Sequence, residues 1–167
     1  MNDTTVRTEF TESSATNGED RYLAPGRMDV LFNGLVRRLT NIGISVAGSR
    51  ELRIVGRKSG QIRTNVVNPL SLDDERFLVA PRGVTAWVRN LRAAKGGELR
   101  VGRRVEPFTA EEMVDADKVP VLRAYLDKWG WEVGRFFPGI TKDSTDAELA
   151  GIASDFPVFW LQTGTAA

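Results

Sequence analysis

The stretch IVGRKSGQIRTNVV, residues 54–67, places two strand-like runs on either side of a Ser-Gly turn. Apolar β-branched residues in both runs are typical of half-buried strands, and the turn itself requires only Gly60 and a small polar neighbour. The stretch nevertheless carries Arg57, Lys58 and Arg63. We predict a β-hairpin with one cationic end that suits a carboxylate or phosphate ligand. The competing interpretation is a solvated hairpin tip.

The surrounding sequence predicts a barrel of about six strands with flanking helices. Strand character is found at 51–55, 62–70, 76–81, 98–113 (which Gly102 divides) and 156–163. Predicted helices are 28–41, 86–94 capped by Thr85, 118–130 capped by Asp117 and ended by Gly130, and one turn at 146–152. Because strands and helices do not alternate regularly, the order favours an α+β barrel over a doubly wound sheet.

Length and composition favour one folded domain. We predict a single domain at residues 21–167 after a flexible tail at 1–20, because the tail is rich in polar residues and poor in large apolar ones. No apolar run is long enough to span a membrane and no secretory signal pattern opens the chain, so we expect a cytoplasmic protein. The amphipathic 28–41 helix either packs on the barrel, which we favour, or makes a peripheral membrane contact.

The chain contains no Cys and no His. This composition excludes disulfides, thiolate nucleophiles, Ser-His-Asp triads and zinc sites built on imidazole or thiolate. The acidic pair Asp73 and Asp74 lies between two predicted strands, where such pairs usually form a solvated turn, so we predict no metal site. Carboxylate chemistry, an organic cofactor or a purely binding role remain as alternatives.

Charge is distributed unevenly along the chain. Residues 50–104 carry 13 Lys or Arg against 5 Asp or Glu, whereas the flanks are acidic. A basic central segment indicates an anionic partner. Nucleic acid is the less favoured partner, because the basic residues are not interleaved with aromatic ones and the acidic flanks would repel a long polyanion.

The order of the motifs resembles a known family. LRIVGRKSGQIRTNVVNPL, a strand ending LVAPRG, the helix TAWVRNLRA and a basic hairpin GELRVGRRVEPF resemble the deazaflavin (F420)-dependent nitroreductase family. The resemblance covers about residues 33–113. It implies a split β-barrel similar to flavin-reductase barrels, which binds coenzyme F420, a deazaflavin with a phosphate and an oligoglutamate tail.

The resemblance also implies a set of cofactor-binding residues. The turn would hold the phosphate or tail, the strand after it would line the path to the ring, and a later strand end and helix would complete the cleft. In that order the residues are Arg57, Lys58 and Ser59; Arg63, Thr64 and Asn65; Ala80, Pro81 and Arg82; and Ala86, Trp87, Arg89 and Asn90.

The activity implied is transfer of a hydride from the reduced deazaflavin to an electron-poor acceptor such as an enone, quinone or nitroaromatic. A deazaflavin carries this chemistry itself, so the lack of Cys and His is consistent with it. Family members with Tyr or Ser near the ring have Asn68 and Pro81 as counterparts here, and Val84 stands where others have His. Tyr125 is our predicted proton donor. The alternatives are a non-catalytic deazaflavin- or flavin-binding barrel, and FMN as the cofactor.

Overall fold

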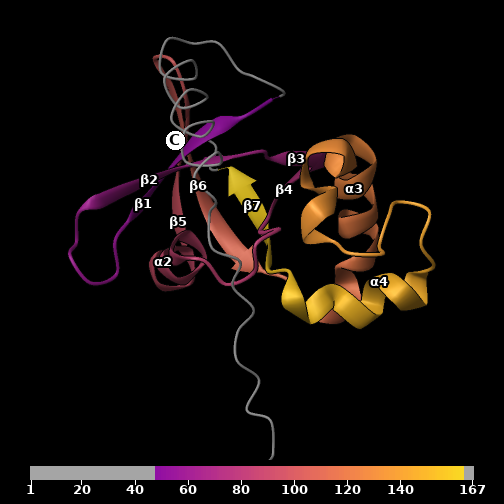
Figure 1. Cartoon of the computed structure of the whole chain (residues 1–167). Helices are drawn as coiled ribbons and strands as arrows, with labels where there is room; N and C mark the ends of the chain where they lie inside the picture. The colour runs from indigo at the N-terminus through magenta and orange to yellow at the C-terminus, as the bar shows by residue number, and fades with distance from the viewer. Residues whose placement is uncertain (1–47, 164–167) are drawn as a thin grey trace, which may run out of the picture.

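Seven antiparallel strands form one sheet in the computed structural model, which describes residues 48–163 (Figure 1). The strands are β1 (Arg50–Val55), β2 (Ile62–Val67), β3 (Leu70–Leu72), β4 (Glu75–Val79), β5 (Gly96–Val101), β6 (Arg104–Glu112) and β7 (Val158–Thr163). The helices are α2 (Ala86–Ala94), α3 (Val119–Val133) and α4 (Asp146–Ile152), with 3-10 turns η1 (Asp115–Asp117), η2 (Gly134–Phe136) and η3 (Ala153–Asp155). None of the helices within 48–163 is both long and apolar enough to cross a membrane.

The strand order shows that the sheet curls into a split barrel. The order is β2-β1-β5-β6-β7-β4-β3, so β2 and β3 are the two edges of the sheet. Only Asn68 and Pro69 separate these edges along the chain, and so short a link requires both edges to lie close together. The sheet is therefore a curled half-barrel whose split runs between β2 and the β3–β4 hairpin. This confirms the predicted α+β split barrel.

The barrel has two mouths, which we define by the strand ends around them. The α2 mouth contains the ends of β1 and β4, the start of β2, and helix α2; the second mouth, the arginine mouth, contains the start of β1 and the β5–β6 turn. In Figure 1 the β1–β2 hairpin projects on the left beyond α2, while α3 and α4 lie on the right.

Two apolar clusters stabilise this arrangement. The first fills the concave side of the sheet and includes Leu52, Ile54 and Leu99, with Val88 and Leu91 of α2 packed on them. The second lies on the other face of β4 and β7, under α3 and α4. It includes Phe77, Val79, Leu122, Tyr125, Trp129, Phe137 and Leu149. Alternate residues of β4 belong to different clusters, as the pleat of a strand requires.

The observed elements correct several boundaries. The run predicted as one strand at 62–70 is two strands, because Asn68 and Pro69 interrupt it and proline has no N–H to donate. Helix 86–94 and the helical turn at 146–152 are confirmed. The tail at 1–20 and the helix at 28–41 lie outside the described residues, so the domain boundary stays a prediction.

Helix α3 differs from its prediction at both ends. Lys118 rather than Asp117 is the N-cap residue, and the helix passes Gly130 to end at Val133. Packing of Trp129 and Val133 in the second cluster outweighs the low helix propensity of glycine. The Lys118 side chain is buried and donates to Asp115 Oδ1 at 2.6 Å and to the Ala153 carbonyl at 3.1 Å, so it ties the start of α3 to η1 and η3.

Candidate functional site

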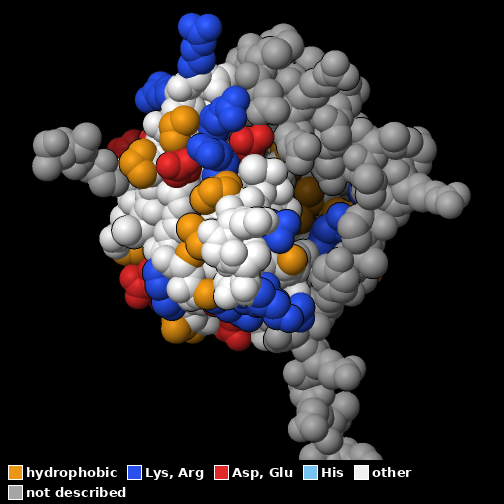
Figure 2. Space-filling view, turned by 90° about the vertical axis from the view of Figure 1, so that its left-hand side faces the viewer, with side chains coloured by type: hydrophobic (Ala, Val, Ile, Leu, Met, Phe, Trp, Pro, Cys, Tyr) orange, Lys and Arg blue, Asp and Glu red, His pale blue; other side chains and the backbone are white. Residues whose placement is uncertain are grey.

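The α2 mouth collects most of the predicted cofactor-binding residues. They come from the β1–β2 turn and β2, from residues 80–85 after β4, and from α2. Figure 2 faces the hairpin side of the molecule and shows a band of basic side chains across it. The exposed cations contributed by the hairpin and α2 are Arg57, Lys58, Arg63 and Arg89.

A bridge between Arg57 and Asn90 joins the turn to the helix. Arg57 Nη1 donates to Asn90 Oδ1 at 2.9 Å, and the Arg57 backbone N–H donates to the same oxygen at 3.3 Å. Asn90 is only 6% exposed, so this acceptor is fixed by its surroundings. The turn is therefore held against α2 and does not splay freely into solvent. Thirty-three residues separate the two partners in sequence, yet both were predicted to bind the same cofactor.

The turn and β2 divide their side chains between two faces. Arg63 and Asn65 pair with Ile54 and Leu52 of β1 and share the concave face with Val67, whereas Thr64 points to the opposite face. Arg63 Nη2 also approaches Ser59 Oγ at 3.4 Å. Of the three residues predicted to line the path to the ring, the structure brings Arg63 and Asn65 to the barrel interior side and separates Thr64 from them.

The segment after β4 forms the facing wall. Ala80 is buried in the first cluster, and its carbonyl accepts from the Gly83 N–H at 3.0 Å in a turn that leads into α2. The guanidinium of Arg82 lies 5.3 Å from the ring centroid of Phe136, which brings the aromatic segment after α3 to this wall. Trp87 packs against the first cluster, and its ring centroid lies 6.0 Å from that of Phe159, so Trp87 contributes to the core.

The charges at the α2 mouth suit an anionic ligand. Residues 56–65 and 80–90 contain the five cations Arg57, Lys58, Arg63, Arg82 and Arg89, and neither stretch contains a carboxylate. Guanidinium groups bind carboxylates and phosphates through paired hydrogen bonds. The N-terminus of α2 adds a positive dipole end at the same mouth, with no acidic residue in its first turn.

A family model described as F420H(2)-dependent quinone reductase matches residues 33–130, more than half of the chain. The chain belongs to this family. The resemblance inferred from the sequence is thereby confirmed, and the cofactor is coenzyme F420 rather than FMN. The protein is an F420H2-dependent reductase, and therefore an oxidoreductase.

Solved structures support the fold. An F420-H2 dependent reductase (FDR-A) is 17% identical over 69% of this chain and 94% of its own, with a TM-score of 0.50. A structure described as a domain-swapped dimer is 17% identical over 82% of this chain and 100% of its own, with a TM-score of 0.52. The heme storage protein HutZ from Vibrio cholerae is 12% identical over 72% of this chain and 84% of its own, with a TM-score of 0.50. No curated protein is significantly similar to the chain.

The F420H2-dependent quinone reductase family places an anionic cofactor in this fold, and one buried polar atom at the α2 mouth fits such a ligand. Thr85 occupies the N-cap position of α2, but its hydroxyl does not cap the helix as predicted. Its Oγ1 is buried without a hydrogen bond to any residue in the described range 48–163. A buried unpaired hydroxyl is costly, and a bound ligand would satisfy it. The sequence analysis missed Thr85 as a binding residue because a threonine before a helix suggests only a cap.

Tyr125 is not brought together with the cofactor-binding residues. It lies on α3 in the second cluster, 3% exposed, with its ring 5.1 Å from that of Trp129. Burial, and secondarily the charge of Glu132, raises the pKa of the Tyr125 hydroxyl well above its ordinary value. A general acid works best with a pKa near the operating pH, so this hydroxyl is a poor proton donor.

A cavity of about 400 Å³ lies at the arginine mouth. It is lined by residues of β1, β3, β4, β5 and β6, and none of them belongs to the predicted cofactor-binding set. The sequence analysis did not predict this cavity.

Proposed function

We propose that the protein holds F420H2 at the α2 mouth and reduces an electron-poor acceptor, such as a quinone, an enone or a nitroaromatic. The observation that carries the proposal is the Arg57–Asn90 bridge, which fixes an acid-free cationic turn against α2 in a member of this reductase family. Reduction of each acceptor consumes a hydride from the cofactor and a proton.

The residues of this chain have separate roles in the proposal. Arg57, Lys58 and Ser59 hold the anionic tail, and Arg63 and Asn65 line the concave path from the tail to the ring. Ala80, Pro81 and Arg82, with Ala86, Trp87, Arg89 and Asn90, form the wall beside the ring. Thr64 supports the strand from the opposite face. When bound, F420H2 supplies the hydride, and the protein positions the acceptor and excludes water.

The test is a turnover assay with F420H2 and a panel of quinones, enones and nitroaromatics, followed through the optical signal of the oxidised deazaflavin. Oxidation that depends on both the protein and an acceptor supports the proposal. Tight binding of F420H2 without turnover of any acceptor would contradict it and indicate a binding barrel instead.

We expect Thr85→Val to weaken F420H2 binding several-fold without lowering the free energy of unfolding. Valine keeps the shape of threonine but removes a hydroxyl that has no partner within residues 48–163, so the apo protein loses no hydrogen bond. Fluorescence titration with F420H2 and urea unfolding measure the two quantities. Thr85→Ser, which keeps the hydroxyl, is the matched control and should bind like the wild type. Equal affinity of the two variants would remove Thr85 from the site.

We expect Tyr125→Phe to leave the turnover number unchanged, because the hydroxyl lies in the second core cluster and its pKa is raised. The measurement is kcat with F420H2 and a quinone across pH 6–9. A fall in kcat of an order of magnitude or more, with an altered pH profile, would restore Tyr125 as the proton donor. Trp131 is 77% exposed, so Trp131→Phe is a control for changing an aromatic residue on α3 outside the core.

A further inference from the structure

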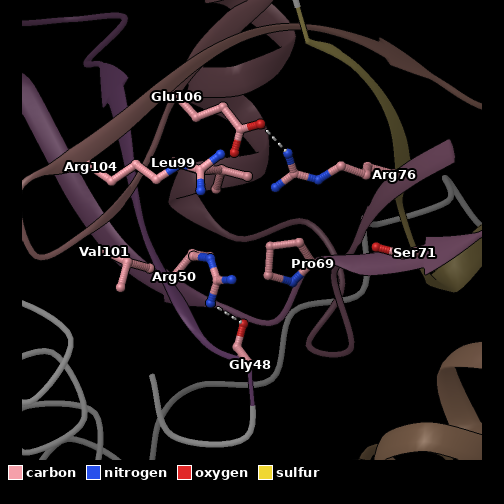
Figure 3. Close-up of a pocket in the computed structure, with 9 residues that line it drawn as sticks. All are labelled: Gly48, Arg50, Pro69, Ser71, Arg76, Leu99, Val101, Arg104 and Glu106. Carbon is pink, nitrogen blue, oxygen red and sulfur yellow. Dashed lines mark hydrogen bonds and ion pairs between the residues drawn. The ribbon is translucent and has the colours of Figure 1, made fainter. Parts of the chain in front are cut away.

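The guanidinium groups of the β1–β2 hairpin have neutral partners. Arg57 donates to Asn90 Oδ1 and Arg63 approaches Ser59 Oγ, and neither arginine forms an ion pair within residues 48–163. Elsewhere in this range, carboxylates pair with Arg53, Arg76, Arg92, Arg100 and Arg123. Figure 3 shows one such pair at the arginine mouth, where Arg76 Nη1 lies 2.7 Å from Glu106 Oε1. The hairpin therefore keeps its positive charge.

Asn90 orients Arg57 through a single atom. Asn90 is 6% exposed on α2, and its Oδ1 accepts from Arg57 Nη1 at 2.9 Å and from the Arg57 backbone N–H at 3.3 Å. An amide oxygen has two lone pairs, so both are used and none is left to accept from a ligand. The two donors also fix the orientation of the amide, because Nδ2 cannot accept a hydrogen bond.

The neutrality of this acceptor decides how much charge Arg57 offers a ligand. A carboxylate at position 90 would reach the same two donors, but it would neutralise the guanidinium, as Glu106 does for Arg76. An amide oxygen orients the guanidinium and leaves its charge in place. A side chain that is already oriented also loses less conformational entropy when it binds an anion than a freely rotating one. Both properties favour a ligand with phosphate or carboxylate groups.

We propose that Asn90 is a positioning residue that acts through Arg57 and makes the α2 mouth selective for deazaflavins with an anionic tail. The proposal rests on the proposed function, in which Arg57 holds the tail of F420H2. Arg57 makes the contact with the ligand, and Asn90 sets the direction of its guanidinium. The role of Asn90 therefore concerns the tail of the cofactor and not its ring.

Two ligands separate this role from a general effect on the site. F420H2 carries the tail, whereas a tailless reduced deazaflavin has the same ring with neither phosphate nor oligoglutamate. Fluorescence titration gives the Kd of each. We expect Asn90→Asp to weaken F420H2 binding about tenfold, because the charge of Arg57 is neutralised, and to leave the affinity for the tailless ligand unchanged. The salt dependence of F420H2 binding should become weaker as well.

Three further variants complete the test. In an Arg57→Gln background, Asn90→Asp should have little further effect, because no guanidinium is left to neutralise. Asn90→Ala removes the acceptor without burying a new charge, and it should weaken F420H2 binding several-fold with no change for the tailless ligand. Gln162→Glu adds a negative charge at an exposed position of β7, outside the α2 mouth, and should bind both ligands like the wild type.

The outcomes distinguish this proposal from the proposed function. Equal losses for both ligands, unchanged F420H2 affinity in Asn90→Asp and Asn90→Ala, or a full effect of Asn90→Asp in the Arg57→Gln background would each overturn the role of Asn90. The proposed function would survive each of these results. Failure of the wild type to bind F420H2 would contradict the proposed function and this role together.

Discussion

Replacing Arg57 and Lys58 together with Ala is expected to weaken F420H2 binding about a hundredfold, which corresponds to ~2.8 kcal/mol. Each charge-assisted contact to an anionic tail contributes about 1.5–3 kcal/mol to binding. Because the turn is exposed, solvent screening keeps the binding free energy lost with both cations near the low end of the sum of two such contacts. Because these residues are proposed to hold the tail and not the reacting ring, kcat at saturating cofactor should stay close to the wild-type value.

Fluorescence titration with F420H2 at several salt concentrations measures this effect. The wild-type affinity should fall as salt rises, and that dependence should be weaker in the double variant. The matched control is the double variant Arg103→Ala/Arg104→Ala. It removes two exposed cations at the β5–β6 turn, which lies at the arginine mouth. If both double variants lose affinity equally, net charge and not the turn controls binding, and the proposed cofactor site is wrong.

The parts of this site that were predictable from sequence are local. The β1–β2 hairpin follows from residue alternation around a Gly turn, and α2 follows from apolar residues at helical spacing after Thr85. Neither pattern predicts that Asn90 accepts two hydrogen bonds from Arg57, because that contact depends on how the helix packs on the sheet. The family resemblance assigned both residues to the cofactor site, but it did not predict that they contact each other.

The arginine mouth illustrates the opposite case. Arg50, Arg76 and Arg104 lie on three strands, and each is unremarkable in its own segment. Their convergence depends on strand order and on the one-residue precision of register, because a shift by one residue would turn a side chain to the other face. Single-sequence patterns contain no information on the pairing of β1 with β5 or of β4 with β7. A cavity assembled by long-range register is therefore found only in the folded molecule.

The largest expected effect on stability comes from Gly97→Ala, which should lower the free energy of unfolding by about 3 kcal/mol. Gly97 lies in β5 between β1 and β6, and a Cβ there would stand 2.6 Å from the Arg53 carbonyl oxygen. The obstacle is backbone of a neighbouring strand, so no side-chain rotation relieves it and the sheet must shift. The shift would occur beside the end of β1, where the chain enters the cationic turn, so F420H2 affinity should fall as well.

Gly130→Ala is the matched control for this variant and should change stability in the opposite direction. Gly130 lies inside α3, and a Cβ there meets nothing within 4 Å. Alanine in an open helical position should raise the free energy of unfolding by about 0.5–1 kcal/mol through reduced backbone entropy of the unfolded chain. Urea unfolding, followed by circular dichroism, gives the free energy of unfolding of both variants. The two values can be compared if the m-values are equal. If Gly97→Ala proves as stable as Gly130→Ala, then β1 and β5 do not approach as closely as the structure shows. The placement of the turn against α2 would then not be supported.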